Sequence, residues 1–354
     1  MQRNARLEID LKALMHNLSV VRQYSANAKI IAVIKANAYG HGMLSIGRQL
    51  ENAVDALAVA CVDEALVLRE AGINAELIVL QGFQNQQQLD QCLAFNLQPV
   101  CHQDWQVELL SQAVSQHQLN CWLKVDTGMH RLGVALKQAA LLSQQLEDAA
   151  VVKKVRLMSH FANADDSSSA LNQSQLDAFN QCQQQLGLEA SLANSAAILS
   201  MPQAIKHWVR PGIMLYGSSP FATQPASEYD LKPVMTLKSQ VIAINSLSRG
   251  QSVGYGGLWS CTRDSQIAVV GIGYGDGYPR HAASGTPLLV NGQRCPLVGR
   301  VSMDTICVDV TDCEAPVQTG DEVILWGGQL DVNEVAKAAS TISYELLCHA
   351  GRDQ

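Results

Sequence analysis

Apolar and polar positions along the first 215 residues follow two alternating patterns. Short apolar runs such as residues 30–34 are followed by stretches in which apolar side chains recur every three or four residues, as at Leu11, Leu14 and Leu18. The first pattern is typical of buried strands and the second of amphipathic helices. We expect eight strands, near 30–34, 55–60, 77–81, 99–101, 121–126, 155–160, 190–194 and 208–215. We expect intervening helices near 43–53, 63–71, 86–94, 104–116, 135–147, 173–186 and 196–200, after a first helix for which Asp10 is the expected N-cap.

Eight strands that alternate with helices predict a parallel sheet with right-handed crossovers, closed into a (β/α)8 barrel. The pattern changes after residue 226, where short alternating strands replace helices, near 233–245, 266–273, 286–290, 305–310 and 322–326. Asn291 and Gly292 form a hairpin signal between two apolar runs, and one helix is expected near 332–339. We therefore predict an α/β barrel domain over residues 1–225 and a mostly antiparallel β domain over 226–354. Residues 1–10 are expected to pair with the β domain.

Composition excludes several classes of protein. Apolar residues make up 47% of the 354 residues, and the net charge is -7 with interspersed signs, so neither nucleic-acid nor anionic-membrane binding is indicated. The first residues contain no apolar core of signal-peptide type, and no run of eighteen apolar residues occurs in the sequence, so we expect a cytoplasmic protein. Ten scattered cysteines without a Cys-x-x-Cys pair are then expected to be reduced core residues, with no metal site or disulfide framework.

A lysine directly follows the first predicted strand of the barrel. Lys35 would lie where a buried strand meets the cleft above it, and desolvation favours the neutral amine of lysine. A neutral amine at this place is a nucleophile for a Schiff base, or a base that can accept a proton. The alternative is a lysine that extends to solvent from a strand end.

Polar side chains also lie at the ends of other predicted strands, where barrel enzymes carry their chemistry. Taken singly, His160 reads as a structural histidine and Arg210 as part of a packing ion pair. Ser195 before a helix, with the Gly212-Ile213 backbone, can present N–H groups to a phosphate. Lys35, His160, Ser195 and Arg210 at four strand ends together fit an aldehyde cofactor with a phosphate tail, which is pyridoxal 5'-phosphate.

The motifs of this chain resemble those of the alanine racemase family from Arg6 to Cys348. The cofactor-lysine motif is residues 33–42, VIKANAYGHG. Further matching motifs occur in the same order: DTGM at 126–129, RLG at 131–133, HFA at 160–162, RPGI at 210–213, GYGDG at 273–277 and GRVSMD at 299–304. The resemblance implies a cytoplasmic isomerase with a barrel and a β domain, which interconverts L- and D-alanine. Such an enzyme supplies D-alanine for peptidoglycan or serves alanine catabolism.

The resemblance also implies roles for individual residues of the barrel. Lys35 would bind the cofactor covalently and act as one of two bases. Arg210 would face the pyridine nitrogen, with His160 linked to it, and Arg131 would bind the substrate carboxylate. The lysine that matches Lys124 is often carbamylated in this family. The phosphate would be held by Tyr39, Ser195, Gly212, Ile213 and Tyr344.

Tyr255 resembles the second base, and its glycine-flanked position reads alternatively as a hairpin turn. The family forms a head-to-tail homodimer with shared sites, so Tyr255 and Met303 would act on the partner's Lys35. The narrow substrate entrance would be lined by Asp165, Tyr274, Arg280, Arg300, Ile342 and Tyr344.

Four other readings remain, and one of them is a catalytically inactive member of the same family. A broad-specificity racemase of this fold usually has a signal peptide and a disulfide, and a decarboxylase has a cysteine-bearing loop where this chain has residues 301–304. A single-domain pyridoxal-phosphate-binding protein lacks the β domain. Family members usually continue through a further strand beyond the end of this chain, so we also expect a missing edge strand and a loosened Tyr344.

Overall fold

The computed structural model describes residues 3–350, and the chain divides into two compact units. One unit comprises residues 18–38 and 42–215. The other comprises the segment up to Asn17, the short segment Tyr39–His41 and the chain from Tyr216 onward. The division falls inside α1 (Leu11–Tyr24), whose start is capped by Asp10 because the Asp10 carboxylate accepts hydrogen bonds from the amides of Lys12 and Ala13.

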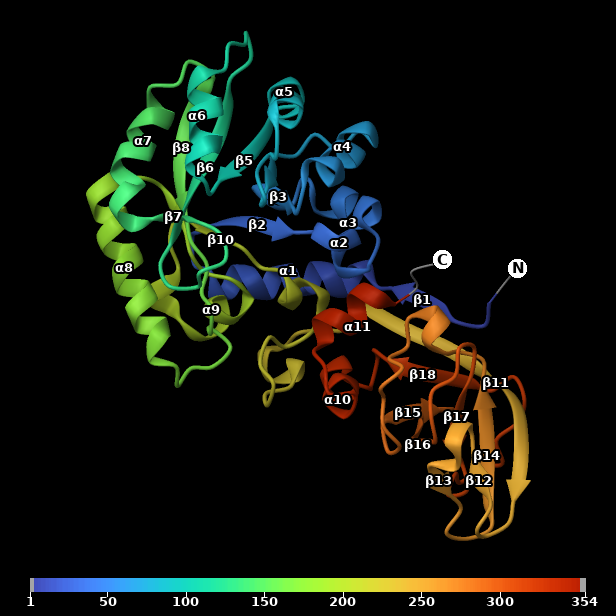
Figure 1. Ribbon diagram of the computed structural model, residues 1–354. Coiled ribbons are helices and arrows are strands. Elements are labelled where there is room, and N and C mark those ends of the chain that lie inside the picture. Colours follow the sequence, from blue (N-terminus) through green and yellow to red (C-terminus); the bar gives the residue numbers. More distant parts are fainter. Residues whose placement is uncertain (1–2, 351–354) are drawn as a thin grey trace. The chain divides into compact units, whose positions relative to one another are not determined.

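The first unit is a closed parallel barrel (Figure 1). Pairing of β5 with β6 closes the ring of eight strands, so the predicted (β/α)8 barrel is confirmed. The ring strands are β2 (Lys29–Val33), β3 (Ala56–Val59), β4 (Leu77–Val79), β5 (Leu97–Cys101), β6 (Leu119–Asp126), β8 (Val152–Met158), β9 (Ala190–Ser191) and β10 (Trp208–Val209), with the short β7 (Val134–Ala135) beside β6. The side chains of β3 and β4 are all buried, as expected for strands covered by helices.

The barrel helices agree with the expected positions within a few residues. They are α3 (Met43–Leu50), α4 (Val62–Glu70), α5 (Gln86–Ala94), α6 (Asp104–Gln112), α7 (Ala139–Glu147), α8 (Ala170–Leu186) and α9 (Ser195–Ser200), with short 3-10 turns η1 (Leu136–Gln138), η2 (Pro202–Ala204) and η3 (Ile213–Tyr216). The expected helix over 104–116 ends four residues early, at Gln112. The strands expected to end at His160 and Leu215 are shorter, so the polar residues stand on the turns that follow them.

The segment after β2 differs most from expectation. The hydrophobic pattern predicted no helix directly after this strand, but α2 (Lys35–Tyr39) is one turn of left-handed helix, with φ between 52° and 54° from Ala36 to Tyr39. The Ala38 amide donates to the Ile34 carbonyl at 2.9 Å, and the Ala36 amide donates to the Glu64 carboxylate at 2.8 Å. These contacts oppose the strain of left-handed backbone in residues that carry a Cβ.

The second unit contains an antiparallel sheet that also closes on itself (Figure 1). Its ring consists of β11 (Met235–Leu247), β14 (Ser265–Val270), β17 (Ile306–Asp309), β16 (Gln293–Val298), β15 (Pro287–Val290) and β18 (Glu322–Trp326). The strand β1 (Arg6–Ile9) pairs antiparallel with β11 outside this ring, and β12 (Ser252–Val253) pairs with β13 (Trp259–Ser260). Pairing of β18 with β11 closes this ring within the described residues.

Turns and helices complete the second unit. The hairpin between β15 and β16 turns at Asn291 and Gly292, both with positive φ, as the sequence predicted. The expected helix near 332–339 is α10 (Val332–Ala338). The sequence pattern missed α11 (Ser343–His349), which carries Tyr344, so the expectation of a single helix in this region is wrong. The short turns are η4 (Ala226–Tyr229), η5 (Tyr255–Gly257) and η6 (Tyr274–Asp276).

Candidate active site

The carboxyl ends of the barrel strands bring together the basic side chains that the sequence singled out. Lys35 follows β2, Lys124 lies near the end of β6, His160 follows β8 and Arg210 follows β10 directly. Burial lowers the pKa of Lys124 and of His160, and the nearby charges of Lys35, Arg131 and Arg210 lower both pKa values further. The predicted grouping at one end of the barrel is therefore present, and it forms a cluster of positive charge.

Arg210 is held by four acceptors within the barrel. Its Nη1 donates to Ser191 Oγ at 2.6 Å, and its Nη2 donates to the carbonyls of Ser159 at 2.5 Å and Leu192 at 3.3 Å. Nη2 also lies 3.2 Å from His160 Nδ1. Burial lowers the pKa of Arg210 to about 10, and the guanidinium stays charged near neutral pH. The contacts to Ser191, Ser159 and Leu192 were not foreseen, because these residues carry no motif of their own.

His160 is neutral in this environment. Burial is the main cause of its lowered pKa, and the nearby charges of Arg210, Lys124 and Arg131 lower it further. Arginine has donors only, so Nδ1 of His160 accepts the hydrogen bond from Arg210 and the proton lies on Nε2. His160 therefore has a structural contact, as the simpler reading proposed, within the cluster that the sequence predicted.

Lys124 is almost fully buried, at 8% exposure. Burial lowers its pKa to about 8, with further lowering from Arg210 and Arg131 and an opposing contribution from Asp126. A lysine of this kind has an appreciable neutral fraction near neutral pH, and a neutral amine is a nucleophile.

Arg131 stands on a loop that Asp126 organises. Asp126 Oδ1 accepts hydrogen bonds from the amides of Gly128 at 2.8 Å, Met129 at 3.0 Å and His130 at 3.2 Å. Burial disfavours the charged carboxylate, but these amides and His130 together lower the pKa of Asp126. The loop leaves Arg131 exposed beside the buried cluster.

The predicted phosphate-binding residues of the barrel also lie together. Ser195 opens α9, and its Oγ accepts hydrogen bonds from the amides of Gly212 at 2.9 Å and Met214 at 3.4 Å. Ser195, Gly212 and Ile213 are all buried.

Two tyrosines predicted to hold the phosphate belong to the second unit, where they lie in one ring cluster. Tyr39 stacks on Tyr216 with ring centroids 4.8 Å apart, and Tyr344 lies 6.0 Å from Tyr39. His41 Nδ1 lies 2.9 Å from the Tyr39 carbonyl oxygen, and the His41 ring is 4.5 Å from that of Tyr216. Burial raises the pKa of Tyr39, so its hydroxyl remains protonated. Tyr216 and His41 had no predicted role.

The predicted second base and most of the predicted entrance residues occupy exposed segments of the second unit. Tyr255 is 68% exposed, Met303 56% and Ile342 61%. The turn that carries Tyr274 bonds to the turn that carries Met303, through Tyr274 N to Ser302 O at 3.0 Å. Arg280 and Arg300 are exposed in the same unit, whereas exposed Asp165 belongs to the barrel unit.

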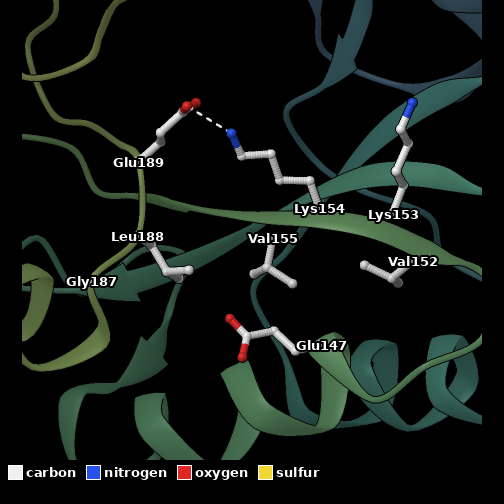
Figure 2. A pocket seen from close by; sticks show the side chains of 8 residues that line it. All are labelled: Glu147, Val152, Lys153, Lys154, Val155, Gly187, Leu188 and Glu189. Atoms are coloured by element: carbon white, nitrogen blue, oxygen red, sulfur yellow. Dashed lines mark hydrogen bonds and ion pairs between the residues drawn. The ribbon is translucent and has the colours of Figure 1, made fainter.

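A pocket of about 440 Å³ lies at the other end of the barrel (Figure 2). Its lining includes Val152 at the start of β8 and Glu189 just before β9. Figure 2 shows Lys154 directed at Glu189, with Nζ and Oε1 2.7 Å apart. In barrels this end serves stability, so the pocket is not the candidate site. Within residues 3–350 no group of three or more metal-binding side chains occurs, and no helix is both long and apolar enough to cross a membrane.

Comparisons with known proteins agree with this arrangement. The family model described as the alanine racemase N-terminal domain matches residues 9–220, and that of the C-terminal domain matches residues 234–354. The alanine racemase of Thioalkalivibrio sulfidiphilus is 50% identical over 353 residues, which cover 99% of this chain and 98% of that protein.

Solved structures give the same result. The biosynthetic alanine racemase of Pseudomonas aeruginosa matches with a TM-score of 0.96 and 40% identity, over 99% of this chain and 98% of that one. The alanine racemase of Bartonella henselae, which has covalently bound pyridoxal phosphate, matches with a TM-score of 0.89 and 31% identity over the same shares. From its motifs, its two-part fold and these likenesses, the chain belongs to the alanine racemase family.

Proposed function

We propose that this protein interconverts L- and D-alanine by a two-base reaction on pyridoxal 5'-phosphate. The observation that carries the proposal is the cluster of Lys35, Lys124, Arg131 and Arg210 around neutral His160 at the carboxyl end of the barrel. Buried positive charge needs a compensating anion. A phosphorylated cofactor and an amino-acid carboxylate supply such anions, so the side chains fit the cofactor.

Different residues of the barrel would bind different parts of the cofactor. Ser195, Gly212 and Ile213 would bind the phosphate, together with Tyr39 and Tyr344 of the second unit. Arg210 has only donors and would hold the pyridine nitrogen unprotonated. Lys35 would hold the cofactor before the substrate binds and would have a free amine once the substrate's amine has taken its place, and the cofactor would supply an electron sink that acidifies the Cα–H bond of the amino acid.

Two side chains would move the proton. Lys35 Nζ takes or returns the α-proton on one face, and Tyr255 Oη does so on the opposite face, because inversion needs one base on each side of Cα. Arg131 would bind the substrate carboxylate and limit its rotation.

Lys124 would carry a carbamate in the working enzyme. Its pKa of about 8 makes the neutral amine available, and Nζ can then attack the carbon of CO2 and release one proton. The new N–C bond turns a cation into an anion, which can pair with Arg131 and Arg210. This change would relieve the repulsion among the basic side chains.

The assembly would be a head-to-tail homodimer. Tyr255, Leu258, Met303 and Ile342 are large apolar side chains on the surface of the second unit, at 56–68% exposure, as expected for a surface that another protein covers. In this dimer Tyr255 and Met303 would serve the Lys35 site of the partner, and Asp165, Tyr274, Arg280, Arg300 and Ile342 would line a narrow entrance suited to small amino acids. The likeness to the biosynthetic enzyme of Pseudomonas aeruginosa favours a role in D-alanine supply.

The test is conversion of L-alanine in heavy water with added pyridoxal phosphate, with the α-proton followed in parallel. D-alanine that carries deuterium at Cα is expected. Lys35→Ala should abolish both inversion and exchange, and Tyr255→Phe should reduce inversion strongly, whereas Tyr24→Phe serves as the matched control. Neither exchange nor inversion by the wild-type protein would contradict the proposal and favour a cofactor-binding protein.

A further inference from the structure

One arginine near the start of the chain joins two distant turns of the second unit. Nε and Nη2 of Arg3 both donate to the Asp276 carboxylate, and the Nη2–Oδ2 distance is 3.1 Å. The same Nη2 donates to Asp304 Oδ1 at 2.6 Å. A single guanidinium therefore connects carboxylates that lie 273 and 301 positions further along the chain.

These two turns carry residues assigned to the reaction. Tyr274 belongs to the same turn as Asp276, and Met303 is the neighbour of Asp304. The turns contact each other closely, because Gly275 N donates to Met303 O at 2.9 Å. A Cβ on Gly273 would lie only 2.3 Å from the same carbonyl oxygen, so only glycine permits this approach.

The two carboxylates differ in what they require. The Asp276 side chain is 3% exposed, and its Oδ2 also accepts a hydrogen bond from the Gly273 amide at 3.0 Å. A carboxylate buried to this extent needs a cation or several donors, and a two-atom contact with arginine also fixes its orientation. Asp304 is 62% exposed, and an exposed ion pair contributes little. The Asp276 contact is therefore the stronger of the two.

The backbone fixes the place from which Arg3 reaches these turns. Residues 6–9 pair with β11 in antiparallel register, and Asn4 accepts a hydrogen bond from the side chain of Gln240 in β11 at 3.2 Å. Arg3 thus extends from an anchored strand, and its side chain spans a short and defined gap.

We propose that Arg3 is a positioning residue that holds the turns of Tyr274 and Met303 in the arrangement the substrate requires. The inference rests on the proposed function, since it concerns residues of that site. We call the contacts of Arg3 with Asp276 and Asp304 the clamp. Loss of the clamp leaves the Asp276 carboxylate without its cation, so the turn around Asp276 must move and displaces Tyr274. A narrow entrance that loses its shape binds a small substrate less well, and KM should therefore rise more than kcat falls.

The test compares Arg3→Gln with Arg6→Gln. Arg6 is an exposed arginine on β1, so its replacement makes the same change of charge three residues away. We expect kcat/KM for L-alanine to fall roughly ten- to hundredfold in Arg3→Gln, mainly through KM, because small displacements near a reacting group have large effects. Arg6→Gln should have the same kcat and KM for L-alanine as the wild type. Arg3→Lys should recover part of the loss, since lysine keeps the charge but not the two-atom contact.

Further variants separate the clamp from general instability. Asp276→Asn should reproduce the Arg3→Gln defect, the double variant should be no worse than either, and Asp304→Asn should have a small effect. Equal kinetic constants for Arg3→Gln and Arg6→Gln, in a protein that racemises alanine, would overturn the clamp and leave the proposed function intact.

A wild-type protein without racemase activity would contradict the proposed function instead. In that case, amide hydrogen exchange tests whether Arg3 holds the two turns in place. Faster exchange of the amides of residues 273–277 and 301–304 in Arg3→Gln than in Arg6→Gln supports it, and equal exchange overturns it.

Discussion

Individual side chains of the barrel alter the proton affinity of their neighbours. Lys124 is the clearest case, because burial and three nearby cations lower its pKa from 10.5 to about 8. The unfolded chain therefore binds more protons than the folded chain between about pH 8 and 10.5. The free energy of unfolding rises with pH wherever the unfolded state binds more protons. The buried charge of Lys124 therefore lowers the free energy of unfolding by its full amount below about pH 8. This destabilisation decreases as the pH rises from about 8 to 10.5.

The prediction concerns the cofactor-free protein with Lys124→Met. Relative to this variant, the wild type should gain up to about 3 kcal/mol of stability between pH 8 and 10.5, since each pKa unit corresponds to roughly 1.4 kcal/mol. Urea unfolding across this pH range measures the difference. The exposed Lys137→Met is the control, and its free energy of unfolding should change with pH as that of the wild type does. The same pH dependence in Lys124→Met would contradict the lowered pKa of Lys124.

The motif residues could be identified from the sequence because residues with reactive side chains recur at predicted strand ends. The groups that form hydrogen bonds with these residues could not be identified in this way. Ser191 and the Ser159 carbonyl hold Arg210, yet serine and backbone carbonyls occur throughout the chain and gave no signal. What distinguishes them is distance to Arg210, which depends on the closed barrel.

At the scale of elements, the left-handed turn α2 is the feature that departs furthest from the pattern. Four consecutive residues, Ala36 to Tyr39, have positive φ, and none of them is glycine. Left-handed backbone is unfavourable by about 1–2 kcal/mol for each residue with a Cβ. Contacts elsewhere in the barrel unit compensate, such as the amide of Met43 donating to Asn37 Oδ1 at 2.8 Å.

This geometry reverses the usual effect of glycine. Ala36 is exposed and contributes its amide, which glycine retains. Ala36→Gly should therefore raise the free energy of unfolding by about 0.5–1 kcal/mol, after the greater freedom of glycine in the unfolded chain is subtracted. Ala178→Gly, inside the right-handed helix α8, should lower it by about 1 kcal/mol. Chemical denaturation of the two variants provides the comparison, and a loss of stability in both would contradict the assignment of α2.

At the scale of the whole molecule, the proposed dimer makes a prediction about mixtures. Lys35→Ala and Tyr255→Phe should each be inactive or nearly so. In a mixed dimer with shared sites, one site carries both substitutions and the other carries neither. Random pairing makes half of the dimers mixed, so co-expression should restore about a quarter of the wild-type activity.

The control is a mixture of Lys35→Ala with the double variant Lys35→Ala/Tyr255→Phe, which leaves no intact site in any pairing. Activity in the first mixture but not in the second would support sites shared between subunits. No recovery in either mixture would mean that each site uses residues of one chain.

The sequence by itself determined most of the elements and the class of fold. Hydrophobic periodicity is a local property, so the alternation of strand and helix could be followed along the chain, and eight such units have few ways to pack. Reactive side chains at the strand ends, together with the family resemblance, were sufficient to identify the candidate site.

Only the tertiary structure decided what depends on distant residues. The low pKa of Lys124 requires burial beside Arg210, and the left-handed turn α2 requires the acceptor Glu64. The contact of Arg3 with Asp276 joins residues 273 positions apart. Such contacts cannot be predicted from periodicity and local propensity. The free energy of these contacts arises only when the folded chain removes the groups from water and brings them together.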